Sequence, residues 1–139
     1  MKEHYFVFSG FKAQVPCRWV TSTPDLWDRG RNFLLYSIHP NYLDTGAALH
    51  LHNIDADGNG RGNVLFTSAV REARQLGATT LFGQYAPRGD DERVKHTRKW
   101  YESHGIDINS NSRLSGDLSI IYARCLSILA QHQTTFEIR

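Results

Sequence analysis

Residues 55–63, DADGNGRGN, are the part of the chain whose residue types and spacing most clearly suggest ligand chemistry. Two carboxylates come first, three glycines follow at every second position, and an apolar run begins directly afterwards. The stretch fits a calcium loop, in which side-chain oxygens are the ligands. It equally fits a phosphate-binding turn at the start of a helix, in which main-chain N–H groups bind the anion. The surrounding residues have to decide between the two.

The calcium interpretation fails in the second half of the loop. An EF-hand loop needs oxygen ligands at positions 1, 3 and 5, a glycine at position 6 and a bidentate Glu at position 12. Asp55, Asp57, Asn59 and Gly60 meet the first requirements, but Phe66 stands where the Glu has to be. The segment before the loop is also typical of a strand and not of a helix. The sequence therefore argues against a calcium site.

The phosphate interpretation agrees better with the neighbouring segments. The glycines lie between a predicted strand over residues 47–54 and a predicted amphipathic helix over 63–76. Glycines allow several N–H groups to converge on an anion, and the helix N-terminus adds a partial positive charge. A nucleoside triphosphate is not expected, because Asn63 and Val64 follow instead of the lysine of a P-loop. A tight strand–helix turn without a ligand remains the alternative.

The elements that must position this loop predict a mixed α/β fold. Apolar and β-branched runs predict strands over 4–10, 33–39, 47–54, 79–86 and 118–126, with an edge strand over 134–139. Helices are expected over 63–76 and within 89–105. Residues 11–32 are expected to be irregular, with a short helix after Thr23. A turn is expected over 39–46 and a loop over 107–117. The strand–helix–strand unit implies a parallel central pair in a mostly antiparallel sheet with flanking helices. We expect residues 1–139 to form one domain.

Composition excludes some classes of protein. The 139 residues carry 16 basic and 14 acidic side chains, and a net charge of +2 gives no support to a nucleic-acid partner. The most apolar run, LSIIYARCLSILA, is short and carries Arg124, so no membrane span is expected. Free thiols at Cys17 and Cys125 and an N-terminus without a signal-peptide core favour a cytoplasmic protein. The oligomeric state is left open, a homodimer included.

The central part of the chain resembles the GCN5-related N-acetyltransferase (GNAT) family. Asp57-Gly58-Asn59-Gly60-Arg61-Gly62 is similar to the family signature Arg/Gln-x-x-Gly-x-Gly/Ala, with its Gly-x-Gly intact. KWYESHGI, near the end of the next predicted helix, is similar to the family segment FYEKxGF. The resemblance covers about residues 47–106. It implies the acyl-CoA N-acyltransferase fold and transfer of an acetyl group from acetyl-CoA, or a related acyl-CoA, to a primary amine of a small-molecule or protein acceptor.

The resemblance also implies roles for individual residues. Tyr101 aligns with the tyrosine that often protonates the leaving thiolate, a task that suits a phenol. His50 and His52 share one face of a predicted strand and are candidates for the general base; they lack a third ligand for a metal, so none is expected. Asp55 and Glu102 are weaker candidates for the base, and water alone could carry the proton. Cofactor binding is expected at His52, Asn53, Ile54, Asp57, Gly58, Asn59, Gly60, Arg61, Gly62 and Asn63, with a main-chain N–H near 52–54 as the oxyanion donor.

Three departures from the family pattern support a second interpretation. Asp57 replaces the usual Arg or Gln and brings a negative charge near the expected pyrophosphate, which Arg61 would compensate. Val94 stands near the place of a customary Asn. Residues 11–32 are too few for the two helices that normally help to enclose the acceptor, which implies an open acceptor site. The alternative function is a non-catalytic module of the same fold that binds acyl-CoA or a partner.

Overall fold

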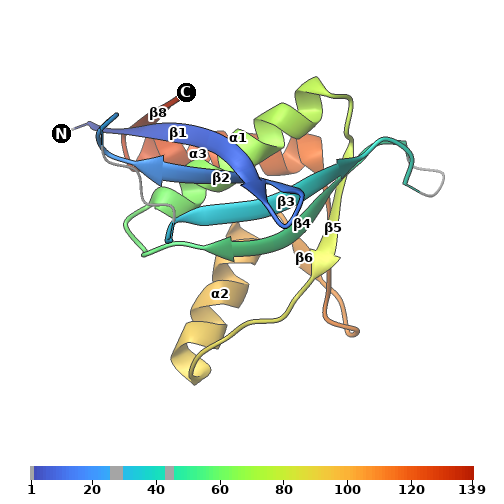
Figure 1. Cartoon of the computed structure of the whole chain (residues 1–139). Coiled ribbons are helices and arrows are strands. Elements are labelled where there is room, and N and C mark those ends of the chain that lie inside the picture. Colours follow the sequence, from blue (N-terminus) through green and yellow to red (C-terminus); the bar gives the residue numbers. More distant parts are fainter. Residues whose placement is uncertain (1, 26–29, 43–45) are drawn as a thin grey trace.

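An eight-stranded mixed sheet in the order β6-β7-β5-β4-β3-β2-β1-β8 forms the centre of the chain (Figure 1). It is seen in a computed structural model, which describes residues 2–25, 30–42 and 46–139. The short helix predicted after Thr23 lies mostly outside these residues, and the turn predicted over 39–46 lies partly outside them. The mixed α/β fold with a central parallel pair is confirmed.

The first four strands form an antiparallel meander of β1 (Glu3–Lys12), β2 (Val15–Thr21), β3 (Phe33–His39) and β4 (Ala48–Asp55). The prediction of an irregular segment over 11–32 was therefore wrong for β2. The two turn residues between β1 and β2 are Ala13 and Gln14, at φ 51° and 64°. Turns of this kind are usually marked by Asn-Gly. Because this turn contains neither residue, the sequence carried no hairpin signal.

The glycine loop is part of a β4–α1–β5 unit, with α1 over Arg61–Gln75 and β5 over Thr80–Gln84. β4 and β5 are parallel, as predicted, and their ladder ends at the pair Leu51–Gly83. On its other side β4 stays paired with β3 as far as Asp55. The residues of β4 after Leu51 therefore have no β5 partner in the ladder, and the two strands part at this point.

The last third of the chain contains the largest error of the sequence analysis. It holds α2 (Asp91–Ser103), β6 (Asp107–Ile108), β7 (Arg113–Asp117), α3 (Leu118–Gln131) and β8 (Thr134–Ile138). The segment predicted as a strand over 118–126 is therefore a helix, and the loop predicted over 107–117 holds two short strands. The buried positions of α3 are Leu118, Ile121, Cys125 and Leu129, a spacing that only a helix gives. The edge strand predicted near the C-terminus is confirmed as β8, which pairs with β1 in parallel.

The core lies between the sheet and the helices on one of its faces. In Figure 1, α1 and α3 lie behind the sheet. Buried side chains such as Leu49, Leu51 and Phe66 belong to the core between the sheet and these helices. Successive side chains of a strand point to opposite faces. His50 and His52, which alternate with these leucines in β4, therefore face the front. In the described part of the chain no helix covers that front face. None of the described helices is long and apolar enough to cross a bilayer.

Candidate functional site

A pocket of about 710 Å³ opens where the end of β4, the glycine loop, the start of α1 and one face of α2 meet. Residues at the starts of β1 and β8 also line it. Its lining consists of Glu3, Ile54, Asp55, Ala56, Gly58, Asn59, Gly60, Gly62, Asn63, Arg93, His96, Thr97, Trp100, Tyr101, His132 and Thr134. A pocket of this volume is in the usual range for a small-molecule or cofactor site.

The glycine loop exposes main-chain donors to this pocket. Gly58 and Gly60 have φ values of +86° and +79°, a conformation that glycine adopts without steric cost. Gly60 is the N-cap of α1 and supplies no side-chain cap, and the first turn of α1 has no acidic residue. By contrast, the carboxylates of Asp90 and Asp117 cap α2 and α3. The first N–H groups of α1 are thus left for solvent or an anionic ligand.

A close contact between α1 and α2 forms the inner wall of the pocket. A Cβ placed on Gly62 would lie 3.4 Å from the Cβ of Ala56 and 3.9 Å from Cζ2 of Trp100. Trp100 Nε1 donates a hydrogen bond of 2.9 Å to Asn63 Oδ1. The Trp100 ring also packs on Phe66, with ring centroids 5.4 Å apart. This contact fixes the position of the loop relative to α2.

Tyr101 lines the pocket from α2, with its ring in the core. Its side chain is 8% exposed, and its ring packs edge-on against Tyr85 at 6.1 Å. Burial, with a smaller contribution from Tyr85, raises the pKa of Tyr101 to about 12. Among the described residues no group makes a hydrogen bond with its hydroxyl. Tyr101 therefore presents a protonated donor to the pocket at neutral pH.

The two histidines predicted as bases lie on the other face of the sheet. His50 and His52 stack with ring centroids 3.8 Å apart on the open face, because Leu49 and Leu51 face the core. Neither histidine is part of the pocket lining that includes Tyr101. Burial and the neighbouring imidazoles lower the pKa of His50 to about 4, and burial and His39 also lower the pKa of His52. Both rings are therefore neutral at pH 7.

Ser37 and His39 of β3 join the histidines of β4, and the sequence analysis missed both. Ser37 Oγ lies 2.8 Å from His52 Nε2 and 3.1 Å from His39 Nε2. The ring centroids of His39 and His50 are 5.5 Å apart. The β3–β4 register, which places Ser37 beside His50, produces this cluster. A single sequence does not contain that register, although the alternation of polar residues in β3 and β4 is visible in it.

The predicted cofactor residues divide into two groups in the structure. Six of them line the pocket: Ile54, Gly58, Asn59, Gly60, Gly62 and Asn63. Four do not: His52, Asn53, Asp57 and Arg61. The structure adds one face of α2, with Arg93, His96, Thr97 and Trp100 beside Tyr101. Their spacing of three and four residues is that of one helical face, and this spacing is a signal that could have indicated them.

Comparison with known proteins identifies the fold. No protein-family model matches the chain, and neither does any curated protein. Among solved structures, the chain is similar to a protein from Desulfovibrio desulfuricans that is assigned to the GNAT acetyltransferases, with 17% identity, a TM-score of 0.52 and coverage of 76% of this chain and 69% of the other.

Two further structures agree with this result. AtaTR bound with AcCoA is 15% identical, with a TM-score of 0.51 and coverage of 78% of this chain and 71% of the other. A KacTA–DNA complex is 18% identical, with a TM-score of 0.55 and coverage of 84% and 76%. The chain therefore has the fold of the GNAT acetyltransferases, as the resemblance of its central segment implies.

Proposed function

We propose that the chain is an N-acyltransferase of the GNAT type, which transfers an acetyl or related acyl group from acyl-CoA to a primary amine. The observation that carries the proposal is the shared pocket: the uncapped N-terminus of α1, the glycine loop and Tyr101 all line one cavity of about 710 Å³. An anion site and a proton donor in one cavity are what a diphosphate-bearing thioester requires. The chain is proposed to work as one domain, without a metal.

In this proposal the chain supplies four functions. The N–H groups of the glycine loop and the start of α1 bind the diphosphate. The opening between β4 and β5 after Leu51 and Gly83 gives the thioester a path through the sheet. A main-chain N–H of β4 within residues 52–54 stabilises the oxyanion. Tyr101 gives its proton to the thiolate when the C–S bond breaks.

The acceptor amine is proposed to approach from the open face. Its nitrogen forms the amide bond with the acyl carbon and loses a proton to the neutral pair His50 and His52, directly or through water. Ser37, at 2.8 Å from His52 Nε2, can receive a hydrogen bond from that imidazole. Asp55 lines the donor pocket and stays the alternative acceptor of the proton. No helix covers this face in the described part of the chain, so the face offers room for a bulky acceptor.

A non-catalytic acyl-CoA-binding module is the second candidate. It is favoured by the position of His50 and His52, which lie outside the donor pocket and on the face opposite to α1. The two candidates predict the same ligand and differ in turnover.

The test measures free-thiol release from acetyl-CoA with a panel of amines: polyamines, amino acids, peptides with a free N-terminus and peptides with lysine. Release that depends on the amine, and that falls in Tyr101→Phe, supports the enzyme. Thermal stabilisation by millimolar acetyl-CoA without turnover of any amine supports the module. If acetyl-CoA leaves the melting temperature unchanged, both candidates fail, because a ligand of the native state has to stabilise it.

A further inference from the structure

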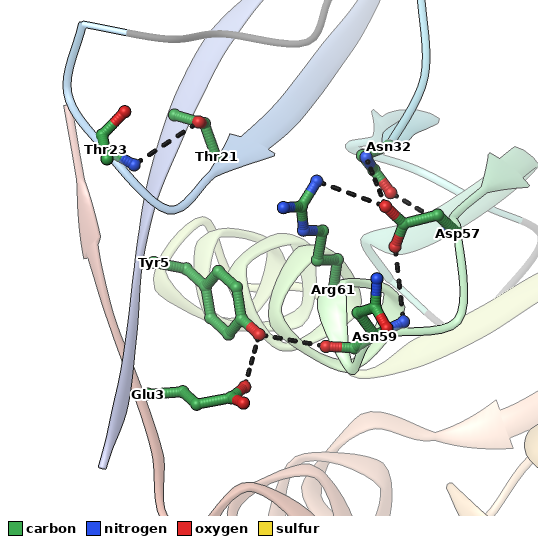
Figure 2. A network of polar contacts seen from close by, with 8 residues as sticks. All are labelled: Glu3, Tyr5, Thr21, Thr23, Asn32, Asp57, Asn59 and Arg61. Atoms are coloured by element: carbon green, nitrogen blue, oxygen red, sulfur yellow. Dashed lines mark hydrogen bonds and ion pairs between the residues drawn. The ribbon is translucent and has the colours of Figure 1, made fainter. Parts of the chain in front are cut away.

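Asp57 departs most from the family signature, and it is not among the residues that line the pocket. Figure 2 shows its carboxylate turned toward Asn32, Arg61 and the N–H of Asn59. Asp57 Oδ1 accepts a hydrogen bond from the N–H of Asn59 at 3.3 Å. Asp57 Oδ2 accepts from Asn32 Nδ2 at 3.4 Å, and the N–H of Asp57 donates to Asn32 Oδ1 at 3.0 Å. Asn32 is fully buried. The loop is therefore tied to a fixed residue that directly precedes β3.

Arg61 balances the charge of Asp57 on the side away from the pocket. Its Nη1 lies 3.3 Å from Asp57 Oδ2, and the two side chains are 21% and 27% exposed. Neither residue lines the pocket. The carboxylate thus has a cationic partner one helical turn away, which reduces its repulsion of an anion on the other side of the loop. This geometry therefore weakens the electrostatic conflict between Asp57 and a phosphate that the sequence suggests.

Tyr5 contacts a carbonyl group of the glycine loop, that of Asn59. Its hydroxyl lies 3.0 Å from the carbonyl oxygen of Asn59 and 2.5 Å from Glu3 Oε2 (Figure 2). The carbonyl of Asn59 therefore lies next to β1, where it shares the single hydroxyl hydrogen of Tyr5 with the closer carboxylate of Glu3. Burial, together with Glu3, raises the pKa of Tyr5 to about 12, so the hydroxyl remains a donor across the working pH range.

We propose that Asn32, Asp57, Arg61 and Tyr5 form a clamp that positions the glycine loop for a diphosphate. The clamp engages the carbonyl of Asn59 and the N–H groups of Asp57 and Asn59, and it leaves the first N–H groups of α1, which have no side-chain cap, for the ligand. The inference rests on the proposed function, since it assumes that the diphosphate of CoA occupies this pocket. The four clamp residues are positioning residues, and the ligand is bound by the main chain that they hold.

The test compares ligands with and without phosphates. Equilibrium binding of CoA, dephospho-CoA and pantetheine is measured by calorimetry and by intrinsic tryptophan fluorescence, to which Trp100 of the pocket lining contributes. Asp57→Asn loses the ion pair with Arg61 and turns an amide toward the Nδ2 of Asn32. We expect this variant to lower the affinities for CoA and dephospho-CoA by the same factor of about ten or more, while the affinity for pantetheine changes by less than about twofold. A loss that depends on the diphosphate is not expected from a general defect in folding.

Two other variants complete the experiment. Glu137→Gln on β8 is the matched control, because Glu137 also has an arginine partner at 3.3 Å but lies outside the pocket and the clamp. It should bind all three ligands like the wild type. Tyr5→Phe keeps the ring and loses only the hydroxyl, so it replaces Asp57→Asn if that variant does not fold. Tyr5→Phe should lower the affinities for CoA and dephospho-CoA as Asp57→Asn does.

The outcomes separate this inference from the function on which it rests. If the wild type binds CoA and both clamp variants bind it equally well, the clamp proposal is wrong. The clamp proposal is also wrong if the variants lose affinity for CoA and for pantetheine by the same factor, since the residues then only maintain the fold. If the wild type itself does not bind CoA, the proposed function fails.

Discussion

Replacement of Tyr101 by Phe separates the chemistry of the proposed site from its architecture. The ring of Tyr101 is buried against Tyr85, and Phe keeps that packing. The hydroxyl has no hydrogen-bond partner among the described residues, so its loss leaves no partner group unsatisfied. We therefore expect the free energy of unfolding to change by less than about 0.5 kcal/mol or to rise slightly. The melting temperature of Tyr101→Phe should stay close to that of the wild type.

Activity is expected to fall sharply in the same variant. A general acid contributes about 10²- to 10⁴-fold to the rate, so kcat for acetyl transfer should fall by that factor, while KM for acetyl-CoA should stay within about threefold. The rate of thiol release with both acetyl-CoA and the amine at saturation measures kcat. Because the pKa of Tyr101 is raised to about 12, the wild-type rate should not fall through loss of this proton at any pH up to about 10.

Tyr85→Phe is the matched control for this experiment. Tyr85 belongs to the same aromatic cluster and loses one long hydrogen bond, of 3.4 Å, to the carbonyl of Val94. Its hydroxyl does not line the pocket, so kcat should be unchanged. If Tyr101→Phe keeps wild-type kcat with the best amine, the assignment of Tyr101 as the acid is refuted. Equal losses in both variants would point to packing instead of proton transfer.

Three further predictions concern stability. Glu72→Ala should lower the free energy of unfolding, measured with urea, by about 2–4 kcal/mol, because it leaves the buried guanidinium of Arg18 without its carboxylate. Glu72→Gln should lower it by less. Equal losses in the two variants would argue against a role of charge. Asp117→Ala should lower the free energy of unfolding by about 0.5–2 kcal/mol in the same assay, since it removes the side-chain cap of α3. Asp117→Asn should keep most of that stability, because Asn also caps helices. The pKa of His50 is lowered to about 4 and that of His104 is lowered by burial, so the unfolded chain binds protons before the native chain does. Stability should therefore fall as the pH drops from 6.5 toward 4, and a melting temperature that is constant over this window would contradict the burial of these rings.

The sequence predicted the central unit well because its signals are local. The glycine loop, the helix after it and the parallel strand pair depend on residues that are neighbours in the chain, and all three are found. The segment 118–126 failed because its β-branched residues favour a strand, although Asp117 before it is a helix cap. In the structure, the helical spacing of Leu118, Ile121 and Cys125 prevails because α1 offers that stripe a surface to bury.

The candidate site was predictable to the extent that it lies on one segment. The glycines of the loop and Tyr101 could be named from motifs, and both line the pocket. The hydrogen-bond partner of Asp57 could not be named from the sequence, because Asn32 is 25 residues away and only the fold brings the two residues into contact. The same reason applies to Ser37 and His52, which lie on different strands. Contacts between distant segments decide the role of a side chain, and one sequence does not contain them.

The pairing of β1 with β8 sets an order for folding during synthesis. The hydroxyl of Thr135 bonds the carbonyl of Glu3 across 132 residues, so the outer edge of β1 has no partner until nearly all of this sequence has left the ribosome. Until then the nascent chain carries an open strand edge that is rich in aromatic residues, which is the kind of edge that associates with other chains. Correct folding of this protein in the cell is therefore expected to depend on how well that edge is shielded until β8 has been synthesised.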